Sequence, residues 1–266
     1  EREKLDILAK AVEDAGLYAK EMQAEIHRSY KSDGSVITEA DLTISQRILG
    51  VVGSLFPEAN IISEETLTDF DPDAPYTFVL DPIDGTDAYS QGMPSWAVAL
   101  GILDKNRKPV GAYISAPRWG IGCDSLFVRL DPLSPLLING KPWELAGGKD
   151  IPKQVTMGSS GQRLMDFSNY HGRVRIFGSS ILQMLAPVIY THIQGCLNQS
   201  CFVWDIAASH AVLLSCGMDI QYVDGSAFVY DDNFVLDRKT FFPSFYAGTE
   251  ACRKEMARVL PAIVRE

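Results

Sequence analysis

The ten residues TFVLDPIDGT, at positions 77–86, decide how the rest of this chain is interpreted. The first four are typical of a buried strand, and the strand ends abruptly in two carboxylates, Asp81 and Asp84. Gly85 and Thr86 can then begin a short helix whose free backbone N–H groups face an anion. Carboxylates beside an anion site repel phosphate unless cations lie between them, so this stretch predicts bound divalent metal.

Two further acidic positions follow apolar runs elsewhere in the chain. Glu64 and Glu65 come after the strand-like run 60–62, and Asp205 comes after the apolar run 202–204 at the predicted start of a helix. Taken alone, the glutamates are better explained as a solvated turn, and Asp205 serves equally well as a helix N-cap. Because Mg²⁺ takes its ligands from several carboxylates, the combination favours one shared magnesium site.

Composition excludes several classes of protein. The 266 residues carry a formal net charge of -10, which repels polyanions and argues against nucleic-acid binding. The five cysteines form no C-x-x-C pair, so we expect neither a disulfide framework nor a zinc site, and a reducing, cytoplasmic location fits best. The apolar stretch 181–193 is too short to span a bilayer, and the charged start leads into no secretory core, so no membrane segment is expected.

The hydrophobic pattern predicts an α+β protein in two halves. Apolar residues recur at helical spacing over 5–26 and 44–55, with Asp41 at the entrance of the second helix. Short β-prone runs then fill 60–138 and predict a largely antiparallel sheet, with a hairpin turn at Asn139-Gly140. After Gly147-Gly148 strands alternate with helices, the last of which is predicted at 250–264, and this divides the chain into an α+β half at 1–147 and an α/β half at 148–266.

Four separated motifs together resemble those of one enzyme family. The motifs are 31–41, 63–65, 81–86 and 204–208, and their sequences and order are similar to those of the inositol monophosphatase family of magnesium-dependent, lithium-sensitive phosphatases. The resemblance runs from Lys31 to the terminal helix. It implies a layered αβαβα sugar-phosphatase fold, hydrolysis of a small phosphomonoester by a metal-activated water, two or three Mg²⁺ ions per site, and a homodimer.

The resemblance also implies a role for each motif residue. Thr86 would hold the attacking water, Asp41 would accept a hydrogen bond from Thr86, and Glu65 would add coordination near the same water. The implied metal ligands are Glu65, Asp81 and the backbone carbonyl of Ile83 at one ion, and Asp81, Asp84 and Asp205 at a second. The implied phosphate contacts are the amides of Gly85 and Thr86, and the implied substrate contacts are Asp87, Gly178, Ser179 and Ser180. Ser179 and Ser180 are explained almost as well as the start of a helix over 179–193.

The substrate stays open because the chain departs from the family pattern. Asp87 is either solvated or contacts a third cation or a cationic substrate group, and the segment 195–200 lacks the acid that inositol-specific members place there. The motif 63–65 looks like that of 3'-phosphoadenosine nucleotide phosphatases, whereas 90–96 looks like a loop of histidinol-phosphate phosphatases. The alternatives are therefore a 3'(2'),5'-bisphosphate nucleotidase, a histidinol-phosphate phosphatase, or a catalytically silent phosphate-binding member.

Overall fold

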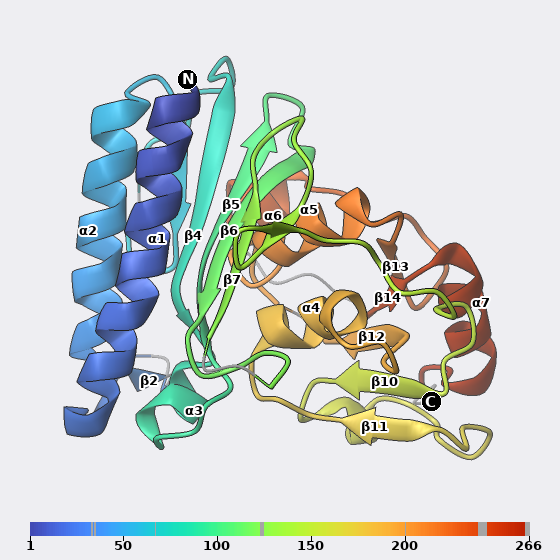
Figure 1. The fold of residues 1–266 in the computed structure, drawn as a ribbon. Helices are drawn as coiled ribbons and strands as arrows, with labels where there is room; N and C mark the ends of the chain where they lie inside the picture. The colour runs from blue at the N-terminus through green and yellow to red at the C-terminus, as the bar shows by residue number, and fades with distance from the viewer. Residues whose placement is uncertain are drawn as a thin grey trace.

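Two long helices form one side of the molecule. The structure is a computed structural model that describes residues 1–32, 34, 36–66, 68–122, 125–199, 201–238 and 244–263. Helices α1 (Arg2–Met22) and α2 (Glu39–Leu55) lie side by side, and α1 continues into a short 3-10 turn at Gln23–Glu25 (Figure 1). Their apolar faces are buried, as the helical spacing of the sequence predicts.

A seven-stranded sheet packs with one face against these helices, in the order β3-β4-β5-β6-β7-β8-β9 (Figure 1). Only β3 and β4 pair in parallel, which confirms the predicted, largely antiparallel sheet. The predicted turn at Asn139 and Gly140 joins β8 to β9, with φ values of 49° and 75°. The strands are β3 (Asn60–Ser63), β4 (Tyr76–Asp84), β5 (Ala97–Asp104), β6 (Pro109–Ala116), β7 (Leu126–Leu130), β8 (Leu137–Ile138) and β9 (Lys141–Pro142).

A second sheet of five strands follows in the C-terminal half, in the order β11-β10-β12-β14-β13. The strands β10 and β12, with only four residues each, were not predicted. Parallel pairs join β10 to β11 and β12, whereas β14 pairs antiparallel with β12 and β13. The strands are β10 (Gln154–Met157), β11 (Arg173–Arg175), β12 (Gly195–Asn198), β13 (Asp219–Tyr222) and β14 (Phe245–Gly248), and a separate ribbon pairs β1 (Ser29–Tyr30) with β2 (Val36–Ile37).

Helices α4 (Ser180–Ile189) and α5 (Ala207–Ser215) fill the space between the two sheets, and α7 (Glu250–Val259) covers the outer face of the second sheet (Figure 1). The order of layers is therefore α, β, α, β, α, which confirms the predicted fold. One hydrophobic cluster joins the inner faces of both sheets to α4 and α5. Two short helices, α3 (Thr86–Ser90) and α6 (Asp232–Val235), lie on connecting segments.

The predicted boundary at 147/148 falls between the two sheets, since β9 ends at Pro142 and β10 begins at Gln154. The division into two halves stays a prediction, because the central hydrophobic cluster draws residues from both. The terminal helix ends at Val259, ahead of Pro261, whereas the sequence predicted helix up to residue 264, which lies outside the described residues. None of the described helices is both long and apolar enough to cross a bilayer.

Candidate active site

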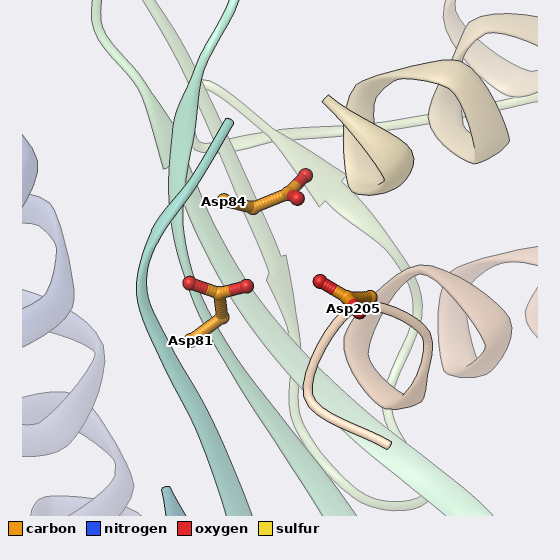
Figure 2. A group of neighbouring side chains, drawn as sticks. All are labelled: Asp81, Asp84 and Asp205. Atoms are coloured by element: carbon orange, nitrogen blue, oxygen red, sulfur yellow. The ribbon is translucent and has the colours of Figure 1, made fainter. Parts of the chain in front are cut away.

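Three carboxylates from the two halves meet between the sheets. Oxygen atoms of Asp81, Asp84 and Asp205 all lie within 4.8 Å of one another, and Figure 2 shows the side chains around one common space. Asp81 and Asp84 are 1% and 5% exposed, so water screens their charges little. The sequence predicted this association, and the structure brings together acids that are more than 120 positions apart.

A bulge in β4 lets Asp81 and Asp84 share one site. Residues three apart in a regular strand point to opposite faces of the sheet, because side chains alternate. The register with β5 shifts between these residues: Asp81 is paired with Ala99, whereas Asp84 is paired with Ala97. The extra residue in β4 re-aims the chain, so both carboxylates face the space between the sheets (Figure 2).

Close packing of α5 on the first sheet places Asp205. A Cβ atom at Gly101 of β5 would lie 2.8 Å from the backbone nitrogen of Ala208 and 2.9 Å from the Cβ of Ala207. Only glycine therefore allows α5 to approach β5 so closely. Asp205 lies in the turn before α5, where its Oδ2 accepts a hydrogen bond from the Phe202 backbone N–H at 2.7 Å. The helix N-cap is Ile206, so Asp205 does not serve as that cap.

Helix α4 holds the carboxylate of Asp84. Its Oδ2 accepts hydrogen bonds from the Ser179 hydroxyl and from the Ile181 backbone N–H, the latter at 2.7 Å. Ser179 is fully buried and is also the N-cap of α4, accepting from the Leu182 N–H at 3.1 Å. The sequence had left open whether Ser179 begins a helix or contacts substrate. The helix start is confirmed, and the substrate contact stays a prediction.

The three aspartates strongly perturb one another's protonation. Burial raises the pKa of Asp81 well above its usual range, and the charges of Glu64, Asp84 and Asp205 raise it further. Burial also raises the pKa of Asp84 to about 6, although its hydrogen bonds from α4 oppose the shift. For Asp205, burial and the charge of Asp84 raise the pKa well above normal. A cation bound among the three carboxylates would lower all three pKa values, because it stabilises the charged form of each acid.

The carboxylate oxygens of this cluster suit a hard divalent cation as ligands. Oδ1 of Asp81 is buried and, among the residues that the structure describes, has no hydrogen-bond partner. A buried carboxylate oxygen without a donor is unfavourable, because it has lost water and gained nothing in exchange. Three carboxylates around one space provide the oxygen ligands that Mg²⁺ or Ca²⁺ takes in proteins.

Thr86 and Asp41 meet beside this cluster. The Thr86 hydroxyl is 2.8 Å from the Ile83 carbonyl oxygen and 3.3 Å from Oδ1 of Asp41. Oδ2 of Asp41 accepts from the backbone N–H of Thr38 at 2.9 Å, which fixes the carboxylate in the capping box of α2. Burial raises the pKa of Asp41 to about 6. The predicted hydrogen bond between Asp41 and Thr86 is present, whereas the catalytic role of the pair stays a prediction.

Gly85 lies at the turn between β4 and α3 and is the N-cap of α3. Its φ is +87°, and a Cβ there would lie 3.1 Å from the Ser95 carbonyl oxygen and 3.2 Å from that of Gly178. A side chain would therefore be strained in conformation and crowded in space. The predicted short helix after Gly85 is confirmed as α3, and phosphate binding by the Gly85 and Thr86 amides stays a prediction.

Glu65 lies outside the group of three aspartates. Its Oε1 is 2.6 Å from Nζ of Lys31, which also lies 2.7 Å from Oε1 of Glu64. Burial opposes the charge on Lys31, but its hydrogen bonds to the two glutamates outweigh that effect and raise its pKa. The role of Glu65 as a ligand stays a prediction. Lys31 was recognised only as part of the motif 31–41, whose positions 33 and 35 lie outside the described residues.

The predicted substrate contacts fall into two groups. Asp87 is on the surface, where its Oδ1 accepts from Arg28 at 2.8 Å and its Oδ2 from Gln91 at 2.9 Å. Gly178 and Ser180 instead line a small cavity near Asp84, with a volume of ≈ 120 Å³. The substrate role of all three residues stays a prediction. The other residues lining this cavity are Gly158, Ser159, Gln183, Asn198, Gln199 and Cys201.

The fold has close counterparts among solved structures. The structure of the extragenic suppressor protein SuhB from Bartonella henselae superimposes on this chain with a TM-score of 0.76. The alignment covers 96% of each chain, and 19% of the aligned residues are identical. At that identity the likeness shows the fold alone. The class defined here is thus an αβαβα protein with a buried carboxylate cluster between its sheets.

Sequence comparison gives the family. The family model described as the inositol monophosphatase family matches residues 2–244, so the chain belongs to this family. The inositol-1-monophosphatase ImpA of Mycolicibacterium smegmatis is 28% identical over 221 residues, which cover 77% of this chain and 76% of ImpA. The Nus factor SuhB of Pasteurella multocida is 26% identical over 229 residues, covering 80% and 82% of the two chains.

Proposed function

We propose that this protein is a magnesium-dependent phosphatase that hydrolyses a small phosphomonoester. The observation that carries the proposal is the cluster of Asp81, Asp84 and Asp205, with a buried Asp81 oxygen that lacks a donor among the described residues. Membership of the inositol monophosphatase family supports it. Such an acidic cluster repels phosphate by itself, so a metal must bind first.

Five groups of the chain are proposed as metal ligands: the carboxylates of Asp81, Asp84, Asp205 and Glu65, and the carbonyl of Ile83. When bound, Mg²⁺ would supply positive charge for the phosphate oxygens and would lower the pKa of a water molecule in its coordination shell. Oε1 of Glu65 contacts the Lys31 ammonium, so Glu65 would coordinate the metal through Oε2 or would exchange the ammonium for the metal at Oε1.

Thr86 and Asp41 are proposed to orient the attacking water. The single proton of the Thr86 hydroxyl has two acceptors in the metal-free chain, the Ile83 carbonyl at 2.8 Å and Asp41 at 3.3 Å. Metal binding by the Ile83 carbonyl would leave this proton to Asp41, and the lone pairs of the hydroxyl could then accept a hydrogen bond from water. Asp41 keeps this orientation only as a carboxylate, because a protonated acid offers a competing donor. The N–H groups of Gly85 and Thr86 are proposed to hold the phosphate oxygens.

The leaving alcohol is proposed to enter the cavity beside Ser180. The amide-bearing residues Gln183, Asn198 and Gln199 line it, and amide side chains offer both donors and acceptors to the hydroxyl groups of a polyol. The cavity therefore suits a small polyol phosphate, and a panel of phosphate esters decides which alcohol leaves.

Phosphate release in magnesium buffer tests the proposal. The substrates are inositol 1-phosphate, 3'-phosphoadenosine 5'-phosphate, histidinol phosphate and fructose 1,6-bisphosphate. We expect turnover of at least one ester, and Asp81→Asn should abolish it. The matched control is Asp131→Asn, which changes a largely buried acid that is paired with Arg129 away from the site. Unchanged activity in Asp81→Asn would contradict the metal assignment.

A catalytically silent, phosphate-binding protein is the second candidate. The relative from Pasteurella multocida carries the name Nus factor SuhB, which does not name a phosphatase activity for that protein. Calorimetry separates the two candidates: a silent member binds Mg²⁺ and ester without turnover of any ester in the panel. Homodimer formation and a cytoplasmic location stay predictions, the first open to light scattering of the purified chain.

A further inference from the structure

Arg238 reaches from the C-terminal half to the loop that carries Glu65. It follows α6 and is half-buried. Its Nη1 lies 3.0 Å from the Ser63 carbonyl oxygen and its Nη2 lies 2.6 Å from the Thr66 carbonyl oxygen. One guanidinium therefore holds two points of a segment that is more than 170 positions away in the sequence.

The two carbonyls stand on either side of Glu64 and Glu65. Arg238 thus fixes the backbone of the glutamate pair, whereas Lys31 binds the carboxylates themselves. These two cations act differently. Carbonyl groups carry no net charge, so Arg238 acts on this segment through geometry. Its planar guanidinium group holds the N–H donors in fixed directions, which fixes the positions of both carbonyl oxygens.

Arg238 also contacts the segment that carries Asp205. Its guanidinium carbon lies 5.8 Å from the centre of the Trp204 ring, within the range of cation–π attraction. Trp204 is 7% exposed and stacks on Phe202 with ring centres 4.7 Å apart. Since Asp205 follows Trp204 directly, Arg238 touches both the loop of Glu65 and the turn of Asp205.

The backbone at Arg238 supports a role for its side chain. Its φ is +51°, in the left-handed region where glycine is favoured and other residues are disfavoured. A strained residue persists where the surrounding contacts hold it in place. The contacts that do so here are the two carbonyls and the Trp204 ring.

We propose that Arg238 is a positioning residue of the metal centre, which holds the Glu65 loop and the Trp204-Asp205 turn at a fixed separation. The inference rests on the proposed metal-dependent function and deepens it. Groups that orient metal ligands without touching the metal change affinity by about 10- to 100-fold when they are removed. Arg238 therefore tunes how tightly Mg²⁺ is bound, while the ligands decide where it binds.

Calorimetric titration of the full, metal-free chain with Mg²⁺ tests this role. We expect Arg238→Met to bind Mg²⁺ about 10- to 100-fold more weakly than the wild type. Arg238→Lys should lie between the two, because an ammonium cannot offer two parallel donors. Saturating Mg²⁺ should restore kcat in both variants, a rescue that general loss of folding does not permit.

Arg253→Met is the matched control. Like Arg238, Arg253 is half-buried and lies within hydrogen-bond distance of two backbone carbonyl oxygens, those of Asp219 at 3.1 Å and Gly248 at 2.6 Å. Neither β13 nor β14, which carry these carbonyls, carries a proposed metal ligand, so Mg²⁺ affinity should stay at the wild-type value.

Wild-type affinity in Arg238→Met overturns the positioning role and leaves the proposed function intact. Absence of Mg²⁺ binding in the wild type overturns both. If Arg238→Met does not fold, Arg238→Lys decides the question: wild-type affinity in that variant overturns the proposal.

Discussion

Replacing Asp81 by Asn should stabilise the metal-free protein while it abolishes activity. Two unit charges 4.8 Å apart repel by ~3.5 kcal/mol at an effective dielectric constant of ~20, so a charge on Asp84 alone opposes a charge on Asp81 by about 3.5 kcal/mol, and burial opposes it further. Protonating an ordinary aspartate at pH 7 costs about 4 kcal/mol. Repulsion and burial together therefore favour the protonated form of Asp81, and the cost of protonation limits the stability that the substitution can recover.

We expect Asp81→Asn to raise the free energy of unfolding by about 2–4 kcal/mol at pH 7 in chelator, and the Tm by roughly 5–10 °C. The pH dependence has a definite sign. Asp81 and Asp84 have pKa values raised in the folded state, so the folded chain binds more protons than the unfolded chain, and wild-type stability falls as pH rises from about 4 towards 7. The stability of the variant should converge with that of the wild type at low pH.

Thermal and urea unfolding, with and without Mg²⁺, measure these effects. Magnesium at a hundred times its dissociation constant should stabilise the wild type by about 2.7 kcal/mol. Mg²⁺ should raise the free energy of unfolding of Asp81→Asn much less, because this variant has lost a charged metal ligand. A variant that is less stable than the wild type at pH 7 in chelator would refute the reasoning, since it would mean that the three carboxylates do not repel one another.

Three further outcomes follow from contacts around the site. Asp41→Asn should lower kcat by about 10²–10⁴-fold, because the amide no longer orients Thr86. Wild-type kcat should fall as the pH drops through about 6, where Asp41 becomes protonated, and a pH–rate profile measures this fall. Gly101→Ala should weaken Mg²⁺ binding in calorimetry, since the new Cβ pushes Ala208 and α5 away from β5. Lys149→Met should destabilise the fold by about 1–3 kcal/mol in urea unfolding, because three carbonyls at and after the end of α4 lose the ammonium that donates to them.

Local pattern was sufficient to predict most elements of the fold. The long amphipathic helices and the β-prone runs between positions 60 and 138 were found because their periodicity extends over many residues. The strands β10 and β12 were missed although β13 and β14, which are equally short, were found. In β12, Gly195 and Asn198 are residues that strands disfavour, so its sequence gives no β signal. The terminal helix was predicted too long because helical spacing continues past Leu260, where Pro261 prevents a further turn.

The acids of the site were identified from sequence, but most of their supporting contacts were not. Asp81, Asp84 and Asp205 each follow a strand-like or apolar run, a signal that can be read locally. Arg238 has no such signal, because its partners are backbone carbonyls, which every residue carries. Ala207 and Ala208 were recognised only as part of the motif 204–208, and nothing local identified Gly101 as the residue that packs against them.

The sequence by itself determined that two carboxylates end a buried strand and that further acids end other apolar runs. It also determined the start of α3 at Gly85, because turn chemistry is local. Only the tertiary structure decided that a bulge turns Asp81 and Asp84 towards one space, that Asp205 joins them, and that Glu65 contacts Lys31. The physical reason is that the charge, burial and direction of a side chain depend on neighbours that are distant along the chain.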